Sequence, residues 1–156
     1  MTIVDPVRQA VLDYLDGQSW DYDEHDTFIG LNLAGQTGEW PVVFFMPPDT
    51  EVLIVYSILP VEVSPEWARN VSSYLTAANF GLSIGSFEVD LAAGPRYGEV
   101  RYRTSVELRD VPPSTAIVRN LVDANVATVD AYLSGLLEAA QGRPFESCIA
   151  DAEGAD

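Results

Sequence analysis

The run from Val52 to Leu59 constrains the fold of this chain more than any other segment. Every residue in it is apolar except Ser57. A continuous apolar run of this length is typical of a strand that is buried on both faces of a sheet. We therefore expect the sheet to be covered on each side, either by helices of the same chain or by another subunit.

The remaining pattern of apolar residues and turn residues predicts a single α+β domain. The length of 156 residues corresponds to about one domain. The expected order is α-β-β-β-α-β-β-α, with an antiparallel sheet packed against helices. We expect this domain to span residues 1–142, and residues 143–156 to form a loose acidic tail. The expected elements are residues 6–16, 27–34, 40–46, 52–59, 64–79, 87–91, 100–108 and 114–141.

Capping residues predict where the helices begin. Asp5 precedes Pro6 and Ser64 precedes Pro65, and each pair combines an N-cap residue with a proline at the first helical position. Ser114 or Thr115 is the expected cap of the last helical stretch, which would span roughly 40 Å if unbroken. That stretch either breaks near residues 123–125 or extends across a dimer.

Residues 87–91 and 100–108 form the expected hairpin, because apolar and charged residues alternate in both segments. Pairing Asp90 with Arg101 and Glu88 with Arg103 places opposite charges across from each other. The same register places Val89 opposite a core tyrosine at position 102. We interpret the charged face mainly as a solvated ladder that fixes the register.

The charge composition excludes several classes of function. The chain contains 24 acidic residues and eight basic residues, all of them arginine, which gives a net charge of −16. A phosphate-binding loop of the Walker A type and Schiff-base catalysis both require a lysine. Nucleic acid needs a basic patch, and anionic membrane surfaces repel an acidic protein. We expect neither nucleic acid nor a membrane as a partner.

Other sequence features favour a cytoplasmic location. The single cysteine, Cys148, has no internal partner for a disulfide. No apolar run reaches the 18 residues of a membrane span, and the first ten residues lack the pattern of a signal peptide.

Motif searches give no catalytic, cofactor-binding or metal-ligating residue. Gly81-Leu82-Ser83-Ile84-Gly85 matches G-x-S-x-G, but that motif needs a strand before the serine and a helix after it. Here a helix precedes and a strand follows, so we interpret the glycines as a helix end. His25 is the only histidine and lies in the acidic stretch 20–26, where weak cation binding is an alternative to a solvated turn. Cys148 has acidic neighbours and is expected to be unreactive.

Residues of the second helix and the hairpin resemble the YbjN family. The resemblance combines a helix carrying Trp67, Tyr74-Leu75 and Asn79 with a Phe-x-x-Asp strand at Phe87 and an Arg-Tyr-Arg strand. Residues 5–140 follow the same segment order, including Asp130-Ala131-Tyr132 in the last helix.

This resemblance implies a fold like that of type III secretion chaperones. Those chaperones are small, acidic, cytoplasmic homodimers that bind secreted client proteins without ATP. Members of the YbjN family are described as regulators of sensory transduction, and the resemblance supplies no catalytic or cofactor residue.

The sequence therefore favours a non-enzymatic, dimeric protein-binding module, which acts as a chaperone-like adaptor or as a regulator. Such a module would take up a client segment in an apolar groove or at a sheet edge. The alternative is a small-ligand or cation sensor that uses the acidic stretch or the charged hairpin face. An enzyme would need a mechanism based on carboxylates alone.

Overall fold

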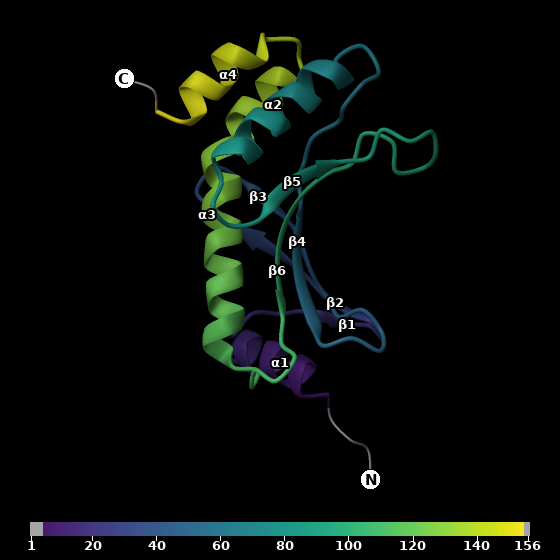
Figure 1. Cartoon of the computed structure of the whole chain (residues 1–156), viewed down its shortest axis with the longest axis vertical. Helices are drawn as coiled ribbons and strands as arrows, with labels where there is room; N and C mark the ends of the chain where they lie inside the picture. The colour runs from purple at the N-terminus through teal and green to yellow at the C-terminus, as the bar shows by residue number, and fades with distance from the viewer. Residues whose placement is uncertain (1–4, 155–156) are drawn as a thin grey trace.

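A six-stranded antiparallel sheet forms one layer of the protein, in a computed structural model that describes residues 5–154. Its strand order is β1-β2-β3-β4-β6-β5, so β6 lies between β4 and β5. Four helices complete the α+β fold (Figure 1). The elements are α1 (Pro6–Gln18), β1 (Asp23–Glu24), β2 (Phe28–Ala34), β3 (Glu39–Phe45), β4 (Val52–Ile58), α2 (Ala68–Gly81), β5 (Ser86–Val89), β6 (Val100–Glu107), α3 (Thr115–Ala139) and α4 (Phe145–Ala152).

The predicted order of elements is confirmed, with β1 and α4 as additions. β1 comes from the acidic stretch that we expected to be a turn, and it pairs with β2 at the edge of the sheet. α1 begins as predicted, because the Asp5 side chain accepts a hydrogen bond from the Val7 amide at 2.9 Å. It continues past Gly17 and ends where Ser19 adopts a left-handed conformation with φ 60°.

The start of α2 differs from the prediction. Residues 64–67 form a turn in which the Trp67 amide donates to the Ser64 carbonyl at 3.1 Å. α2 begins only after this turn, and no side chain caps it. Ser64 and Pro65 thus mark the approach to the helix and not its first residues.

α3 crosses one face of the sheet as one unbroken helix (Figure 1). Of the two caps that the sequence offered, Ser114 is the one used, and its Oγ accepts from the Ile117 amide at 3.3 Å. The alternative of a break near residues 123–125 is wrong, because the Asn125 side chain is fully buried against the sheet. Its hydrogen bonds go to the strands, so they do not compete with the helical backbone.

Asn125 is the centre of a buried polar network between α3 and the sheet. Its Nδ2 donates to the Val55 carbonyl at 3.0 Å and to Thr104 Oγ1 at 3.2 Å, while its Oδ1 accepts from the Ser57 hydroxyl. The Ser57 Oγ in turn accepts from Trp40 Nε1 at 2.9 Å. The only polar interruption of the apolar run therefore has a partner on α3, as buried polar groups require.

A second polar contact holds the turn between β2 and β3 on α3. The Asp130 carboxylate accepts from the Gln36 and Thr37 amides, both at 3.0 Å, and from Thr37 Oγ1 at 2.8 Å. Partial burial would raise the pKa of Asp130, but these hydrogen bonds lower it below its ordinary value. A Cβ at Gly35 would overlap this carboxylate and the Trp40 ring, so the turn needs a glycine there.

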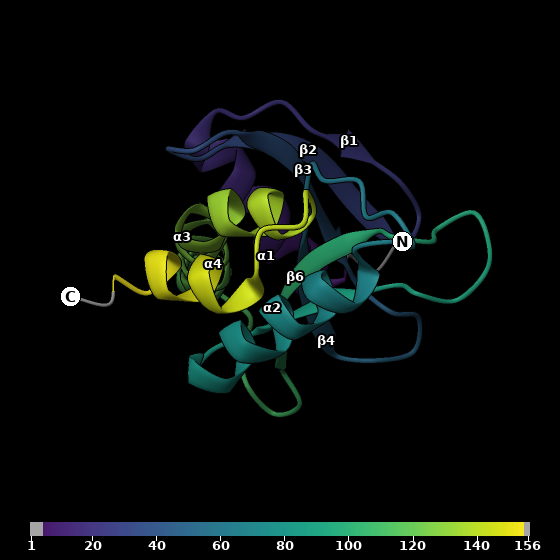
Figure 2. The ribbon, with the colours of Figure 1, turned by 90° about the horizontal axis from the view of Figure 1, so that it is seen from above.

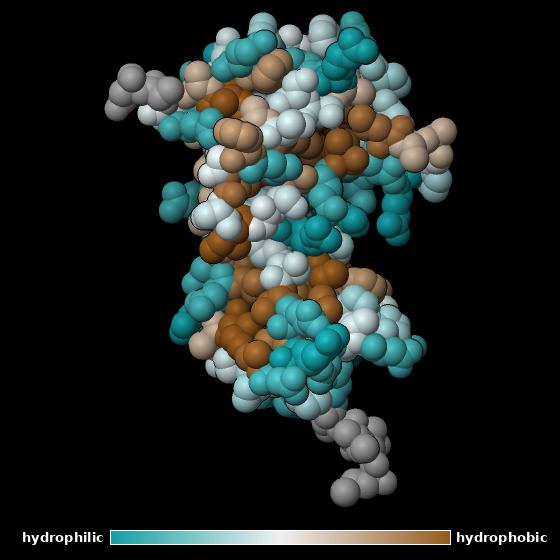
Figure 3. Space-filling model, viewed as in Figure 1, coloured by the Kyte–Doolittle hydropathy of each residue, from teal (hydrophilic) through white to brown (hydrophobic). Residues whose placement is uncertain are grey.

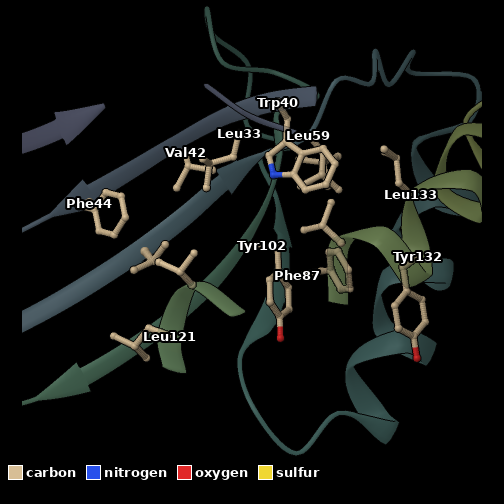
Figure 4. Packing of buried hydrophobic residues seen from close by; sticks show 14 of the residues in the cluster. Leu33, Trp40, Val42, Phe44, Leu59, Phe87, Tyr102, Leu121, Tyr132 and Leu133 are labelled. Atoms are coloured by element: carbon tan, nitrogen blue, oxygen red, sulfur yellow. The ribbon is translucent and has the colours of Figure 1, made fainter. Parts of the chain in front are cut away.

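The helices form one layer against one face of the sheet. α1 packs near one end of α3, and α2 and α4 pack near the other end (Figures 1 and 2). Figure 4 shows buried side chains of β3 and β6 meeting those of α3 and β5. These core residues include Trp40, Val42, Phe44, Phe87, Tyr102, Leu121, Tyr132 and Leu133.

The expected loose tail is wrong for residues 145–152, which form α4. Cys148 is fully buried, and α4 packs against both α2 and α3. Asn70 of α2 holds the segment that connects α3 to α4. Its side-chain amide donates to the Ala139 carbonyl at 2.9 Å and to the Arg143 carbonyl at 2.7 Å. Its Oδ1 accepts from the Phe145 amide at 3.1 Å. The acidic residues of α4 are exposed on one side of the helix, and its apolar side packs against α2 and α3.

The hairpin register differs by two residues from the prediction. Glu88 lies opposite Arg101, and Val89 lies opposite Val100. The connecting loop sets this register: Gly98, at φ 83°, donates to the Asp90 carbonyl at 2.7 Å. Asp90 therefore lies in the loop, and the ion pair that forms is Arg101 with Glu88, at 3.0 Å.

Candidate functional site

The sheet face away from the helices carries a continuous apolar surface. In β4, Leu53, Val55 and Ser57 are buried, whereas Ile54, Tyr56 and Ile58 alternate with them and are half-buried. No helix of the described chain lies over this second face (Figures 1 and 2). Of the two alternatives for covering the sheet, the one in which helices of the same chain cover both faces is therefore wrong for the described residues.

Six half-buried side chains from three neighbouring strands make up the outer-face cluster: Phe28, Val43, Phe45, Ile54, Tyr56 and Ile58. Strand pairing places them side by side, with Phe28 opposite Phe45 and Val43 opposite Tyr56. Five of them line a groove of about 560 Å³. Contiguous apolar patches of this kind, where they stay accessible to solvent, are typical of interaction surfaces.

Charged side chains lie at one end of this groove. Arg96, Glu99 and Arg101 complete its lining. The Arg101 guanidinium lies over the Tyr56 ring, 4.2 Å from its centroid, and also pairs with Glu88. The loop of residues 90–99, which carries Arg96, projects beyond the sheet (Figure 1). The groove thus combines an apolar floor with a border of charged side chains of both signs.

A second groove, of about 690 Å³, lies beside β1. Trp20, Tyr22 and the carboxylates Asp21 and Asp23 line it together with residues of β2 and β3. Nearby, Arg8 pairs with Glu24 at 3.3 Å and donates to the His25 carbonyl at 2.7 Å. Arg8 thus partly neutralises the acidic stretch.

The structure separates the residues that the sequence motifs had singled out. His25 precedes β2 and stacks on Phe28 with ring centroids 4.3 Å apart, whereas Ser83 precedes β5. β1 and β5 form opposite edges of the sheet, so these two residues do not form a catalytic pair. Gly81 ends α2, and Gly85, at φ 73°, packs against Tyr102. This agrees with the interpretation of the G-x-S-x-G motif as a helix end.

The remaining candidate groups have structural surroundings. Burial raises the pKa of the Cys148 thiol, which is the opposite of what a reactive thiolate requires. Across residues 5–154, no three His, Cys, Asp or Glu side chains are grouped closely enough to hold a metal ion. Within the same range, no helix is both long and apolar enough to span a membrane.

Sequence reasoning recognised β4 as apolar on both faces but missed the parts of the outer-face cluster that β2 and β3 contribute, although a signal for them was present. Phe28 alternates with Ile29, and Val43 and Phe45 alternate with Val42 and Phe44, so both faces of β2 and β3 carry apolar side chains. Apolar residues on both faces show only that each face avoids water. They do not distinguish a face covered by a helix from a face left for a partner.

Comparisons with known proteins agree with this fold. No family model matches the chain, and no curated protein sequence matches it. Among solved structures, the chain is similar to YbjN from E. coli, a proposed transcription regulator, with a TM-score of 0.60 and 14% sequence identity. The match covers 88% of this chain and 94% of that chain. The protein thus has a YbjN-like α+β fold, as the sequence resemblance implied, and at this identity the likeness concerns the fold alone.

Proposed function

We propose that this protein is a non-enzymatic binding module, an adaptor or regulator, that acts as a homodimer in the cytoplasm. Its outer-face cluster takes up an apolar segment of a protein partner. The observation that carries this proposal is the cluster itself, with six apolar side chains on neighbouring strands of a face that no helix within residues 5–154 covers. The regulator role named for YbjN supports the same class of function.

The partner segment is expected to be apolar at its centre and charged at its ends. Apolar side chains of the partner segment would fill the groove over Val43 and Tyr56. Their removal from water would drive association. The net charge of −16 favours a partner that is basic overall and speeds the encounter. Raised salt should therefore slow association while leaving the apolar contact in place.

Recovery of the tagged protein from lysate of its own cell tests the proposal when the wild type is compared with two variants. Val43→Glu places a carboxylate in the centre of the groove. Phe80→Glu is the matched control, because it adds the same charge at a side chain on α2 that is 96% exposed. We expect one near-stoichiometric partner with the wild type and with Phe80→Glu, and its loss with Val43→Glu.

Two outcomes would contradict the proposal. Recovery of the bare wild-type protein would favour the small-ligand sensor, and the groove beside β1 would then be the site to test. A partner that Val43→Glu binds as tightly as the wild type would place the binding surface elsewhere. Titration of the purified partner against each variant, at low and at high salt, separates loss of the apolar contact from loss of charge attraction.

A further inference from the structure

Half of β6 forms an open edge of the sheet. β5 pairs with β6 only from Val100 to Arg103, and β6 continues to Glu107. Within residues 5–154, no other strand lies beside Ser105–Glu107 on the β5 side. Ser105 and Glu107 are both exposed.

The backbone groups at this edge can be identified from the bonds of the neighbouring strands. The Leu59 amide donates to the Val100 carbonyl, and the Leu108 amide donates to the Glu51 carbonyl, so even-numbered residues of β6 bond toward β4. Odd-numbered residues bond toward β5, as the pairing of the Asp90 amide with the Glu99 carbonyl confirms. The amides and carbonyls of Ser105 and Glu107 therefore point outward from the open edge.

Apolar surface borders the same edge. Val106 and Ile117 are half-buried against the core, and the Leu121 carbonyl accepts from Thr104 Oγ1 at 3.0 Å, which brings this part of α3 beside β6. Val111, just beyond the strand, is 46% exposed. Figure 3 shows apolar atoms gathered between the lower half of α3 and the lower part of β6, on the side where this edge faces the viewer.

We infer that this open edge of β6 pairs with the same edge of a second copy, in an antiparallel arrangement centred on Val106. Ser105 then lies opposite Glu107 of the partner subunit, and the reverse pair forms by symmetry. In both pairs the two residues exchange hydrogen bonds. The two outward amides and two outward carbonyls of Ser105 and Glu107 are therefore satisfied in each subunit. The inference rests on the proposed homodimer and names its interface.

The length of the edge favours a second copy over a free peptide. Pairing of Arg103 with Ser86 closes the edge at one end, and the turn in which the Val111 amide donates to the Leu108 carbonyl closes it at the other. An edge of three residues offers few hydrogen bonds. Their free energy would not offset the conformational entropy that a flexible peptide loses when it becomes ordered on the edge. A second copy presents the same three residues already extended, together with the apolar surface of its own α3.

Charge also permits this pairing. Ser105 opposite Glu107 avoids like charges directly across the interface, and Glu107 is already paired with Arg109 at 3.0 Å. Repulsion between two subunits of charge −16 opposes the dimer at low salt. Dimerisation is therefore expected to strengthen as salt is raised, opposite to the expected effect of salt on partner association.

Sedimentation equilibrium of Ser105→Pro and Ser105→Thr tests the interface. Proline removes the outward amide of Ser105, which makes no bond toward β4, and proline is tolerated at a strand edge. Threonine keeps the amide and is the matched control. We expect the wild type and Ser105→Thr to dimerise from the 17.0 kDa chain, and Ser105→Pro to raise the dimer dissociation constant at least about tenfold with unchanged circular dichroism.

A dimeric Ser105→Pro protein with wild-type affinity would overturn the interface and leave the proposed homodimer standing. A wild type that is monomeric at high protein concentration and high salt would overturn both. If Ser105→Pro fails to fold, Glu107→Pro removes the other outward amide. Hydrogen exchange of the wild type gives a direct reading: the amides of Ser105 and Glu107 should exchange at least about tenfold more slowly in concentrated than in dilute protein, and equal rates would refute the pairing.

Discussion

Replacing Asn125 by alanine is the sharpest test of how α3 is held on the sheet. The substitution removes an acceptor for the Ser57 hydroxyl and the donors to the Val55 carbonyl and Thr104 Oγ1. Ser57 is fully buried, so no water replaces the lost acceptor directly. The helix itself is not weakened, because alanine has the highest helix propensity.

The expected loss is about 3–4 kcal/mol of unfolding free energy. Each net hydrogen bond contributes about 1 kcal/mol, and a buried hydroxyl left without a partner costs about 1–3 kcal/mol. The space left by the amide adds a smaller cavity cost, about 24 cal/mol per Å³. With a urea dependence of about 2 kcal/mol/M, the unfolding midpoint should fall by about 1.5–2 M.

Urea unfolding followed by tryptophan fluorescence measures this change, since Trp40 is buried beside the network. Asn120→Ala is the matched control, an exposed asparagine on the same helix, and its midpoint should stay within about 0.3 M of the wild type. A loss below about 1 kcal/mol for Asn125→Ala would refute the reasoning. It would mean that side-chain packing alone fixes α3.

Three further substitutions, one of them with a matched glycine control, test the contacts of α3 with the turn between β2 and β3 and the contacts of α2 with the α3–α4 connection. Because hydrogen bonds lower the pKa of Asp130, its contribution to stability is complete above its unfolded pKa and is lost as pH falls through the folded value. The stability difference between wild type and Asp130→Asn, measured by thermal unfolding, should therefore be constant above about pH 5 and shrink below about pH 4. Gly35→Ala should cost about 1–3 kcal/mol by steric overlap, whereas Gly38→Ala, whose Cβ would lie 3.6 Å from Leu133, should cost under about 1 kcal/mol in the same urea assay. Asn70→Ala should loosen α4 and speed modification of the buried Cys148 thiol by a disulfide reagent, and an unchanged rate would show that α4 docks without Asn70.

The local elements of the fold could be predicted because their signals lie within a few residues. Asp5 and Ser114 cap the helices as the sequence predicts, with the hydrogen bonds that such caps make. Even α4 carried a usable signal. Phe145, Cys148, Ile149 and Ala152 recur at the spacing of one helical face. The acidic residues between them concealed this pattern.

Relations between distant segments could not be predicted in the same way. The register of β5 and β6 depends on the conformation of Gly98 in the loop, which alternation of charged and apolar residues does not specify. The role of Asn125 depends on Ser57 and Thr104, which reach it only through the folded sheet. The outer-face cluster could not be assigned to a partner surface for a related reason, since burial by a partner and burial by a helix select the same side chains.

The strand order has a consequence for the protein as it is synthesised. β4 ends at Ile58, but its neighbour β6 begins only at Val100, after α2 and β5 have been made. At about 5–20 residues per second, the ribosome needs roughly 2–10 s to add the intervening segment. Until β6 is in place beside it, β4 is an apolar strand with one unpaired edge, and such an edge favours pairing with other chains and aggregation.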